Sequence, residues 1–305
     1  VRDSQNMSLR TSAYPFPGHM LRSMPWKKSL ISLLLFVVTS TAIATDSTIP
    51  MKLEQIVCGI KEPIYFWVWS TVSGRPNSKR LSGLDGVVDI SFRTQDGRTL
   101  RGYKLDASKT FPPQTEPARG FLLVLQGNAM LADQILGEYR AYARLGYDVY
   151  IYDYRCYGRS EGKRRQKYIV HDIKEILTSL IAQDYEKRFV YAMSLGGVFL
   201  LNALEPDMQL DKIIIDSTPS RLSNYGCPIE YDPIEHLPDD CSNILLVTGQ
   251  RDNVVTPAMS KDLAREAEDR NAIVISDPKF SHPFMDANAT IHQRRMQEIQ
   301  RYFLQ

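Results

Sequence analysis

Apolar and polar positions along the chain alternate between strand-like and helix-like patterns. Residues 120–126 (GFLLVLQ) form a nearly continuous apolar run, as expected of a strand buried on both faces of a sheet. Segments with helical spacing follow such runs repeatedly, which predicts a mostly parallel sheet with helices on both faces. The expected strands are 87–93, 100–105, 120–126, 147–152, 188–193, 212–215, 244–247 and 272–275, and the expected helices are 132–145, 168–184, 195–204, 257–270 and 287–303.

Two segments between the expected strands add detail to the expected architecture. Strands 87–93 and 100–105 are separated by Asp96-Gly97, a dipeptide that favours a hairpin turn. The segment between residues 216 and 243 is short, so it has room for a loop or a small flap but not for a helical cap domain. We therefore expect a central sheet of about eight strands without a large cap domain.

The first 44 residues are predicted to be a targeting segment. Lys27 and Lys28 precede an apolar core at 30–38, and Ala42-Ile43-Ala44 has the small residues that signal peptidase requires. The core is shorter than the roughly 20 residues that span a bilayer, so we expect export to the periplasm or the medium. A membrane anchor formed by an uncleaved signal segment is the alternative.

The predicted organisation is an upstream segment with signal peptide at 1–44, an N-terminal extension at 45–85 and the main domain at 86–305. The extension contains the apolar run 64–69 (IYFWVW), which is expected to pack on the core. A weak contact with membrane or lipid is the alternative, because Trp and Tyr favour interfaces.

Charge argues against a nucleic-acid partner. The chain carries a formal net charge of +2, and residues 45–305 alone carry 32 basic and 34 acidic side chains, a net charge of −2. A chain this close to neutrality has no electrostatic footprint for nucleic acid.

The four cysteines suggest a disulfide if the protein is exported. Cys227 and Cys241 flank one Pro-rich loop, and an oxidising compartment would favour joining them, worth about 3 kcal/mol by chain entropy. Cys58 and Cys156 would then pair by elimination. Four reduced thiols are the alternative.

Ser194 is the candidate nucleophile. It lies in residues 192–196 (AMSLG), between an expected strand and an expected helix. A serine on such a turn exposes its hydroxyl, and small residues two positions before and after it allow strand and helix to approach closely. A helix N-cap is the alternative role for this serine, but an N-cap does not require Ala192, Gly196 and Gly197 together.

A serine hydroxyl needs a base, and the base needs an acid that orients it. In the α/β-hydrolase layout, which this strand and helix order matches, the acid and then the histidine follow the serine along the chain. His282 follows the last expected strand, so its loop belongs to the carboxyl edge of the sheet. His236 precedes the expected acid and breaks the order. His292 lies within the closing helix and is expected to be a surface residue.

Asp252 is the candidate acid. It follows the strand 244–247 at the same carboxyl edge and is followed by residues 254–257 at the start of a helix. Turn formation within residues 251–253 is its alternative role. Asp216, at the end of the preceding strand, is the rival acid.

The oxyanion formed during acyl transfer needs hydrogen-bond donors. Residues 126–129 (QGNA) leave a buried strand and enter a helix, which leaves their backbone N–H groups free. We expect the N–H groups of Asn128 and Leu195 to be the donors. A helix N-terminus with Gly127 easing the turn is the alternative role of this loop.

These motifs resemble the Bem46-like group of α/β-hydrolases, which is related to serine aminopeptidase-type hydrolases. The resemblance covers residues 85–305. The loop 126–129 resembles the family's His-Gly-Asn-Ala motif, residues 153–162 (DYRCYGRSEG) resemble its Asp-Tyr-Arg-Gly-Tyr-Gly-x-Ser-x-Gly motif, and Ser194, Asp252 and His282 fall on its triad positions. Three positions depart from the pattern: Gln126 replaces His, Cys156 replaces Gly, and Ala192 replaces Gly.

The resemblance implies hydrolysis of an ester, thioester or amide without a metal or organic cofactor. We expect an exported serine hydrolase that cleaves a small-molecule carboxylic ester or thioester through an acyl-enzyme. A peptidase or amidase of the same fold is one alternative, and a catalytically inactive binding protein is another.

Overall fold

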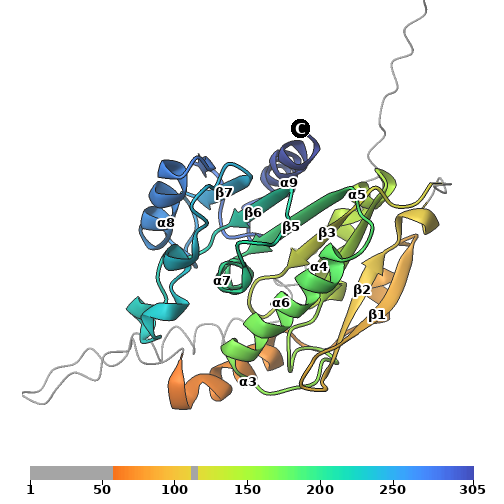
Figure 1. Cartoon of the computed structure of the whole chain (residues 1–305), viewed down its shortest axis with the longest axis horizontal. Helices are drawn as coiled ribbons and strands as arrows, with labels where there is room; N and C mark the ends of the chain where they lie inside the picture. Colours follow the sequence, from red (N-terminus) through yellow and green to blue (C-terminus); the bar gives the residue numbers. More distant parts are fainter. Residues whose placement is uncertain (1–57, 111–115) are drawn as a thin grey trace, which may run out of the picture. The chain divides into compact units, whose positions relative to one another are not determined.

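An eight-stranded sheet is the centre of the computed structural model, which describes residues 58–110 and 116–305 (Figure 1). The strand order is β1-β2-β4-β3-β5-β6-β7-β8; β1 pairs antiparallel with β2, β2 pairs antiparallel with β4, and every other pair is parallel. The predicted fold class is confirmed. The strands are β1 Val87–Arg93, β2 Thr99–Leu105, β3 Gly120–Leu125, β4 Tyr147–Tyr152, β5 Lys187–Met193, β6 Lys212–Asp216, β7 Ile244–Gly249 and β8 Ile273–Asp277.

Helices cover both faces of the sheet. Successive side chains of a strand point to opposite faces, and in β3 Phe121 and Leu123 pack with α6, α7 and α8, whereas Leu122 and Val124 pack with α4, α5 and α9. All six residues of β3 are buried, as its apolar run predicts. The helices are α3 Glu62–Val72, α4 Ala132–Ile135, α5 Arg140–Arg144, α6 Gln166–Ile181, α7 Leu195–Ala203, α8 Pro257–Asp269 and α9 Ala289–Leu304.

The single helix predicted at 132–145 is wrong. Its place is taken by α4, a 3-10 turn at Leu136–Tyr139 and α5. Gly137 is a poor helix former in the middle of this segment. The 3-10 turn also allows Leu136 and Tyr139 both to be completely buried, so the packing of these side chains is favoured over a continuous helix.

The segment between β6 and β7 contains only three 3-10 turns, Ser223–Tyr225, Ile229–Tyr231 and Pro233–His236. No large cap domain lies over the carboxyl edge within the part of the chain that the structure describes, as the length of this segment predicts. The site is therefore built from loops.

Helix α3 belongs to the N-terminal extension and packs beside the start of α6 (Figure 1). Phe66 is completely buried in the core between the helices and the sheet. The carboxylate of Glu62 accepts hydrogen bonds from the backbone N–H of Gln166, the first residue of α6, and from the side chain of Arg165. A buried carboxylate thus caps the N-terminus of α6, where negative charge is favoured.

The described residues fall within one compact unit spanning 45–305. The predicted signal peptide and its cleavage site lie outside the described residues, and the divisions at 44/45 and 85/86 stay predictions. In the described ranges, no helix combines the length and the apolar character that crossing a membrane would require.

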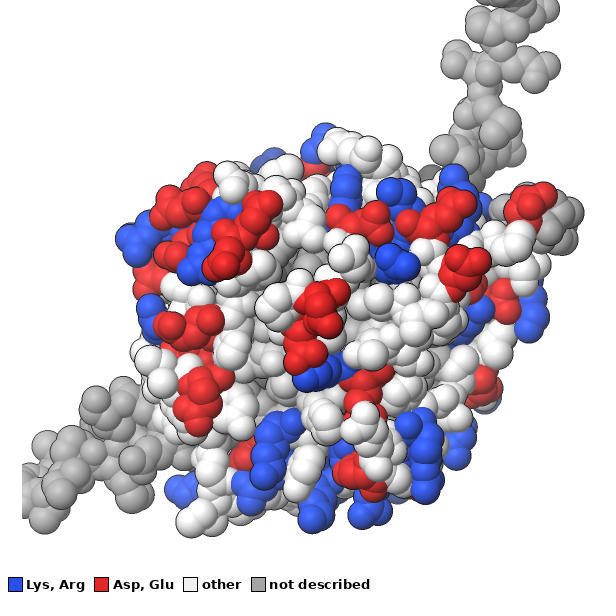
Figure 2. All heavy atoms as spheres, in the orientation of Figure 1, with Lys and Arg blue, Asp and Glu red and all other residues white. Residues whose placement is uncertain are grey.

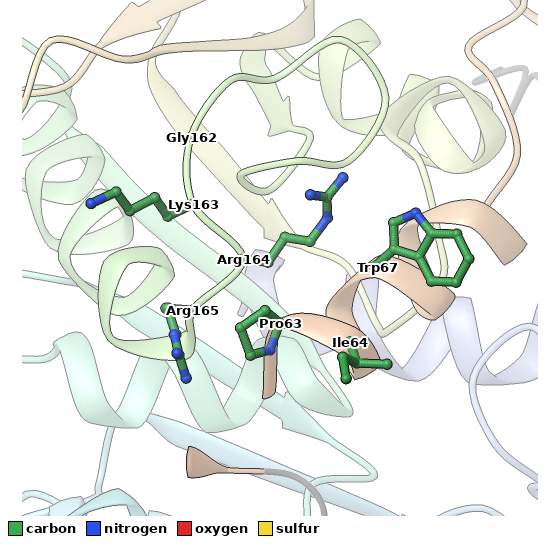
Figure 3. Close-up of a pocket in the computed structure, with 7 residues that line it drawn as sticks. All are labelled: Pro63, Ile64, Trp67, Gly162, Lys163, Arg164 and Arg165. Atoms are coloured by element: carbon green, nitrogen blue, oxygen red, sulfur yellow. The ribbon is translucent and has the colours of Figure 1, made fainter. Parts of the chain in front are cut away.

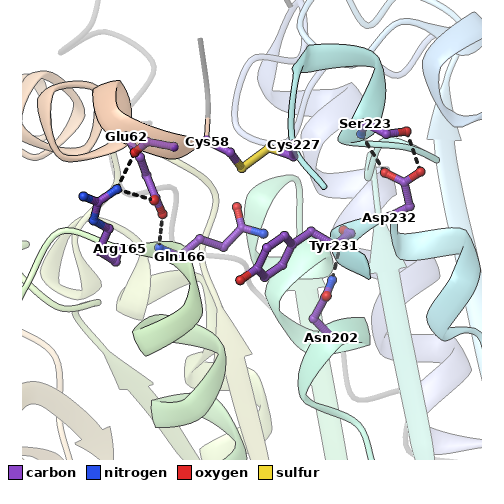
Figure 4. Close-up of a disulfide and its surroundings, with 10 residues drawn as sticks. Cys58, Glu62, Arg165, Gln166, Asn202, Ser223, Cys227, Tyr231 and Asp232 are labelled. Carbon is purple, nitrogen blue, oxygen red and sulfur yellow. Dashed lines mark hydrogen bonds and ion pairs between the residues drawn. A yellow bond between two sulfur atoms is a disulfide. The ribbon is translucent and has the colours of Figure 1, made fainter. Parts of the chain in front are cut away.

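The predicted disulfide Cys227–Cys241 is wrong. Cys227 is bonded to Cys58, 169 residues away, with 5.0 Å between the two Cα atoms (Figure 4). Cys241 and Cys156 are free, so the pairing of Cys58 with Cys156 by elimination is wrong as well. Cys241 is instead buried in the core with its thiol on the carbonyl of Pro238. Short separation in sequence did not bring the two loop cysteines together. Cys241 packs into the core, whereas Cys227 reaches Cys58.

The bridge Cys58–Cys227 should contribute about 2–5 kcal/mol to the free energy of unfolding, because it closes a long loop in the unfolded chain. We expect Cys58→Ser and Cys227→Ser each to lower that free energy by this amount in urea titrations of the oxidised protein. Cys156→Ala is the matched control and should leave the effect of reductant unchanged. Peptide mapping without reduction should link the Cys58 and Cys227 peptides, and a Cys227–Cys241 peptide would contradict the pairing.

Candidate active site

Ser194 occupies a strained turn between β5 and α7. Its backbone angles are φ 53° and ψ −120°, a conformation that residues other than glycine rarely adopt. The neighbouring strand β6 holds this turn, since the Ser194 N–H donates to the Asp216 carbonyl at 2.8 Å and the Thr218 hydroxyl donates to the Ser194 carbonyl at 3.1 Å. Such strain persists only when the surrounding structure supports it.

The two glycines after Ser194 allow α7 to begin directly against the sheet. A Cβ on Gly196 would lie 2.3 Å from the carbonyl oxygen of Leu125 at the end of β3, and a Cβ on Gly197 would lie 2.0 Å from the Thr218 hydroxyl. Both distances are far below van der Waals contact. The small residues that the sequence motif requires are thus required here by close approach of the helix to β3 and to the residues after β6.

Asp252 and His282 are hydrogen-bonded to each other. The distance from His282 Nδ1 to Asp252 Oδ2 is 2.8 Å, and the Asp252 side chain is fully buried while that of His282 is 12% exposed. Burial would raise the pKa of Asp252, but the hydrogen bond and charge of His282 and the N–H groups of Val254 and Val255 lower it below its usual value. A carboxylate that stays ionised at neutral pH therefore faces one ring nitrogen of His282.

The loops after β7 and β8 lie against each other, which is why these two side chains meet. The Gln250 N–H donates to the Asp277 carbonyl at 2.9 Å and the Arg251 N–H donates to the Phe280 carbonyl at 3.0 Å. At Gly249 a Cβ would come within 2.4 Å of the Phe280 carbonyl. The absence of a side chain at Gly249 thus permits the contact between the loop of Asp252 and the loop of His282.

A buried arginine that was not among the predicted site residues holds the His282 loop. Arg295 on α9 is 1% exposed, and its guanidinium donates to the Asp216 carboxylate at 2.7 Å, to Asp286 at 3.1 Å and to the Ser281 carbonyl. Asp286 in turn accepts from the Ser281 N–H at 2.9 Å. The available signal was a charged residue on the apolar stripe of the closing helix, midway between Ile291 and Ile299.

Asp216, the rival acid, has other partners. Its carboxylate accepts hydrogen bonds from the Tyr191 hydroxyl at 2.9 Å, the Ser217 hydroxyl at 3.0 Å and Arg295. The structure thus places Asp252, not Asp216, in hydrogen bond with His282.

His292 and His236 lie apart from this pair. The expectation of a surface position for His292 is wrong, because the residue is 2% exposed and lies 3.6 Å from Glu138 and 3.7 Å from Asp286. Burial favours its neutral form, but these two carboxylates raise the pKa of His292 above its usual value. The side of α9 that carries His292 therefore lies against the core. His236 bonds to the Glu230 carbonyl at 2.7 Å.

The loop of residues 126–129 lies beside Ser194. A Cβ on Gly127 would be 3.5 Å from the Ser194 Cβ, which is ordinary contact. Among the residues that the structure describes, neither the Asn128 N–H nor the Leu195 N–H donates to a protein acceptor. The Asn128 side-chain oxygen accepts from the Ala129 N–H at 2.8 Å and from the Tyr157 hydroxyl at 2.8 Å, so it serves the loop itself.

The loop after β4 holds this candidate oxyanion loop in place. Tyr154 donates its hydroxyl to the Gln126 carbonyl at 2.7 Å, Tyr157 contacts Asn128, and Asp153 accepts from the Ala132 N–H at 2.7 Å. Gln126, which replaces the family's histidine, is fully buried and donates its amide to the Tyr152 carbonyl at 2.9 Å. The motif 153–157 therefore orders the loop next to Ser194.

No cluster of three or more metal-ligating side chains suitable for a metal ion occurs in the described ranges 58–110 and 116–305. The arrangement at the carboxyl edge is one of a strained serine, a histidine bonded to a buried carboxylate, and free backbone donors.

Cys156 adopts a left-handed conformation, with φ 61°, at the position where the family motif has glycine. A side chain at such a position costs about 1 kcal/mol relative to glycine. We expect Cys156→Gly to have a higher free energy of unfolding than Cys156→Ala by about 1 kcal/mol in urea titrations. The alanine variant is the matched reference, because both variants lose the thiol and only one keeps Cβ. Equal stability of the two would contradict the left-handed turn.

Asp153 is predicted to make stability depend on pH. Burial and, to a smaller extent, the charge of nearby Asp133 raise the pKa of Asp153 to about 7, although the Ala132 N–H and the charge of Arg159 oppose the rise. Between the unfolded pKa of about 4 and this value, the folded protein keeps a proton that the unfolded chain has released, so stability falls as pH rises, by at most about 1.4 kcal/mol per pH unit.

Asp153→Asn should remove this fall, because asparagine keeps the acceptor for Ala132 without a titrating group. The measurement is the free energy of unfolding in urea at pH values from about 4 to about 7, with the exposed Asp207→Asn as control. A slope in the Asp153 variant equal to that of the unsubstituted protein would exclude a raised pKa for Asp153.

Comparisons with known proteins bear on the fold of the chain. The family model for serine aminopeptidase S33 matches residues 116–230, which include Ser194 and the loop 126–129. An uncharacterised membrane protein of Saccharomyces cerevisiae is 28% identical over 182 residues, which cover 53% of this chain and 62% of that protein. The chain thus spans less than two thirds of the length of this curated relative.

Three solved structures share the fold at low sequence identity. An α/β hydrolase from Vibrio vulnificus is 15% identical, with 84% of this chain and 98% of that chain covered and a TM-score of 0.60. An esterase of Pyrococcus furiosus is 15% identical, with 75% and 95% covered and a TM-score of 0.57. A puromycin-hydrolysing peptidase of Mycobacterium tuberculosis is 17% identical, with 75% and 40% covered and a TM-score of 0.54. By its sheet, its loops and these similarities, the chain has the α/β-hydrolase fold, and residues 116–230 resemble the serine aminopeptidase S33 family.

Proposed function

We propose that this protein is a serine hydrolase that cleaves a carboxylic ester or thioester through an acyl-enzyme. The observation that carries the proposal is the 2.8 Å hydrogen bond between His282 and the buried Asp252, at the same sheet edge as the strained turn of Ser194. A histidine oriented by a buried carboxylate is the arrangement that a serine nucleophile needs.

Each residue has one role in the proposed reaction. The Ser194 hydroxyl attacks the acyl carbonyl carbon, and His282 takes the hydroxyl proton through Nε2, because Nδ1 is bonded to Asp252. Asp252 fixes the ring orientation and stabilises the imidazolium. His282 then delivers the proton to the leaving alcohol or thiol. Water, deprotonated by the same histidine, attacks the acyl group and releases the acid and free Ser194.

The oxyanion would be bound by the backbone N–H groups of Asn128 and Leu195. Both belong to the loops that flank Ser194, and neither donates elsewhere within the described residues. A donor of this kind contributes about 3 kcal/mol to the stability of the transition state. The bonds from Tyr154 and Tyr157 to residues 126 and 128 support this assignment, because they fix the loop before substrate binds.

An ester is the first choice of substrate, and a peptide or other amide is the alternative. An alkoxide or thiolate leaves with less help from a proton than an amine does, so a serine, a histidine and two backbone donors suffice for an ester. The family description and the mycobacterial neighbour's name favour the alternative enough to test it.

Export also belongs to the proposal. The apolar segment 30–38 after Lys27 and Lys28 supports it, and so does the disulfide between Cys58 and Cys227, since such bonds persist in oxidising compartments. Retention of the segment as a membrane anchor is the alternative, and the yeast relative's name contains the word membrane.

A fluorophosphonate probe should label the protein at Ser194, and Ser194→Ala should abolish labelling and lower ester hydrolysis by at least about 10³-fold. Asp252→Asn should lower kcat by a similar factor, because the wrong ring tautomer of His282 would face Ser194. The readouts are peptide mapping of the adduct and hydrolysis of p-nitrophenyl acyl esters of increasing chain length.

Ser217→Ala is the matched control, because Ser217 directly follows β6 and has the same φ of 53° as Ser194. It should still be labelled. Absence of labelling in the unsubstituted protein, or equal labelling after Ser194→Ala, would favour a binding protein without this chemistry. Faster turnover of aminoacyl anilides than of any acyl ester would favour a peptidase.

A further inference from the structure

Helix α3 exposes apolar side chains on one side. Ile60 is 94% exposed, Ile64 59% and Trp67 54%, whereas Phe66 on the opposite side of the helix is completely buried. The spacing of four and three residues places the first three along one face of the helix and the turn before it. Exposed apolar residues that gather in this way mark an interaction surface more often than isolated ones do.

Basic side chains surround this face. Lys61 precedes α3, and Lys163, Arg164, Arg165 and Lys167 lie at the start of α6 beside it. Arg165 pairs with Glu62, but the other four form no ion pair within the described ranges of the chain. Four of these five basic residues lie in one run of the sequence, 163–167 (KRRQK), and the fold brings this run beside α3, about 100 residues earlier in the chain. Figure 2 shows mostly Lys and Arg along the lower edge of the molecule, where α3 lies in Figure 1.

The two groups of side chains meet in a pocket of about 480 Å³. Pro63, Ile64 and Trp67 form its apolar wall, and residues 162–165 form its basic wall (Figure 3). An apolar wall against a basic wall suits an amphiphile with a negatively charged head.

Helix α3 is held rigidly in this position. The disulfide joins Cys58 to Cys227, and Glu62 caps α6 (Figure 4). Phe66 anchors the helix in the core. The face is therefore presented as a preformed surface, which lowers the entropic cost of binding.

We propose that this α3 surface, formed by Ile60, Lys61, Ile64 and Trp67 with Lys163, Arg164, Arg165 and Lys167, docks on a bilayer of anionic phospholipid. Trp67 and the two isoleucines would enter the interface, where Trp is favoured, and the Lys and Arg side chains would contact lipid phosphates. The surface would do so whether or not the proposed hydrolysis occurs.

The charge and the exposed apolar residues of the α3 surface favour an anionic bilayer over two other partners. A second copy of the chain would place unpaired Lys and Arg against Lys and Arg, which disfavours a dimer through this face. A soluble anion would explain the basic residues but not the exposed Ile60, Ile64 and Trp67. A negatively charged surface with an apolar interior explains both groups.

Because helices run back along a parallel sheet, the start of α6 lies at the carboxyl edge, the same edge that carries Ser194 and His282. Docking through the α3 surface would therefore bring this edge towards the bilayer. If the proposed function holds, acyl esters in the membrane would lie within reach of the site.

The test uses the full chain with a protease site introduced between residues 45 and 57, so that the apolar segment 30–38 can be released after folding. Binding is measured by co-sedimentation with vesicles of phosphatidylcholine alone or mixed with phosphatidylglycerol. The cleaved protein should bind the mixed vesicles in a salt-dependent way and should shift its Trp emission to the blue, and Trp67→Phe should lose most of that shift.

Two sets of substitutions separate charge from apolar contact. Lys61→Glu/Lys163→Glu/Lys167→Glu should weaken binding to the mixed vesicles about 100-fold, at about fivefold for each basic group. Ile64→Ser/Trp67→Ser should weaken it at least about tenfold.

The matched controls lie elsewhere on the molecule. Lys261→Glu/Arg265→Glu/Lys279→Glu replaces three exposed basic residues on and after α8, and Ile273→Ser removes an apolar side chain that is 51% exposed on the edge strand β8. Both controls should bind within about twofold of the parent. Thermal unfolding of every variant checks that the fold is kept.

Three results would overturn the proposal. Equal binding to both kinds of vesicle, or equal losses in the test and control sets, would exclude docking by the α3 surface. An anion site would be indicated if charge reversal weakened vesicle binding, Ile64→Ser/Trp67→Ser did not, and soluble glycerol phosphate competed with the vesicles. A concentration-dependent dimer in sedimentation velocity that Ile64→Ser/Trp67→Ser abolishes would indicate a second copy as the occupant.

Discussion

The arrangement of the whole carboxyl edge depends on one close approach, that of α7 to the sheet after Ser194. Gly196 lies under the Leu125 carbonyl at the end of β3, and Gly197 lies against Thr218 after β6. Because the helix begins this close, the chain between β5 and α7 has room only for a turn with positive φ. That turn places Ser194 between the loop after β3 and the loop after β6, so a single steric constraint fixes the neighbours of the candidate nucleophile.

Backbone strain in the described residues is concentrated at this edge. Of the six non-glycine residues with positive φ, only Asn271 lies in a turn away from it. Each such residue costs on the order of 1 kcal/mol and has to be supported by its surroundings. Here the support comes from hydrogen bonds between loops, such as those from Tyr154 and Tyr157 to the loop after β3. The other five, one on each of five loops, are Ala129, Cys156, Ser194, Ser217 and Phe284.

The strands and the Asp252–His282 pair could be predicted from the sequence because both follow from local pattern and chain order. Apolar runs determine which segments are buried on both faces, and parallel strands bring their following loops to one edge. The failures share a different cause. The partner of Cys227, the burial of His292 and the basic α3 surface depend on contacts between segments far apart in the chain, and no local pattern encodes such contacts. The broken helix at 132–145 likewise reflects packing that overrode helical spacing.

The role of Asp216 shows how a sensible rival prediction can be right about position and wrong about chemistry. The residue ends β6 at the carboxyl edge, where an acid for His282 could lie. Its carboxylate instead binds Arg295, which holds both Asp286 and the Ser281 carbonyl next to His282. A buried arginine without such partners would be strongly destabilising, so the loop needs both Asp216 and Asp286 to keep its shape.

It follows that two carboxylates act on His282 by different routes. Asp252 acts by a direct hydrogen bond to Nδ1, and Asp216 acts through Arg295 and the backbone of the His282 loop. In the proposed reaction, loss of the first would change which ring nitrogen carries the proton. Loss of the second would displace the ring without changing its tautomer. The position of His282 is therefore determined by α9 and β6 together, although only β7 and β8 lead into the loops where the histidine and its acid meet.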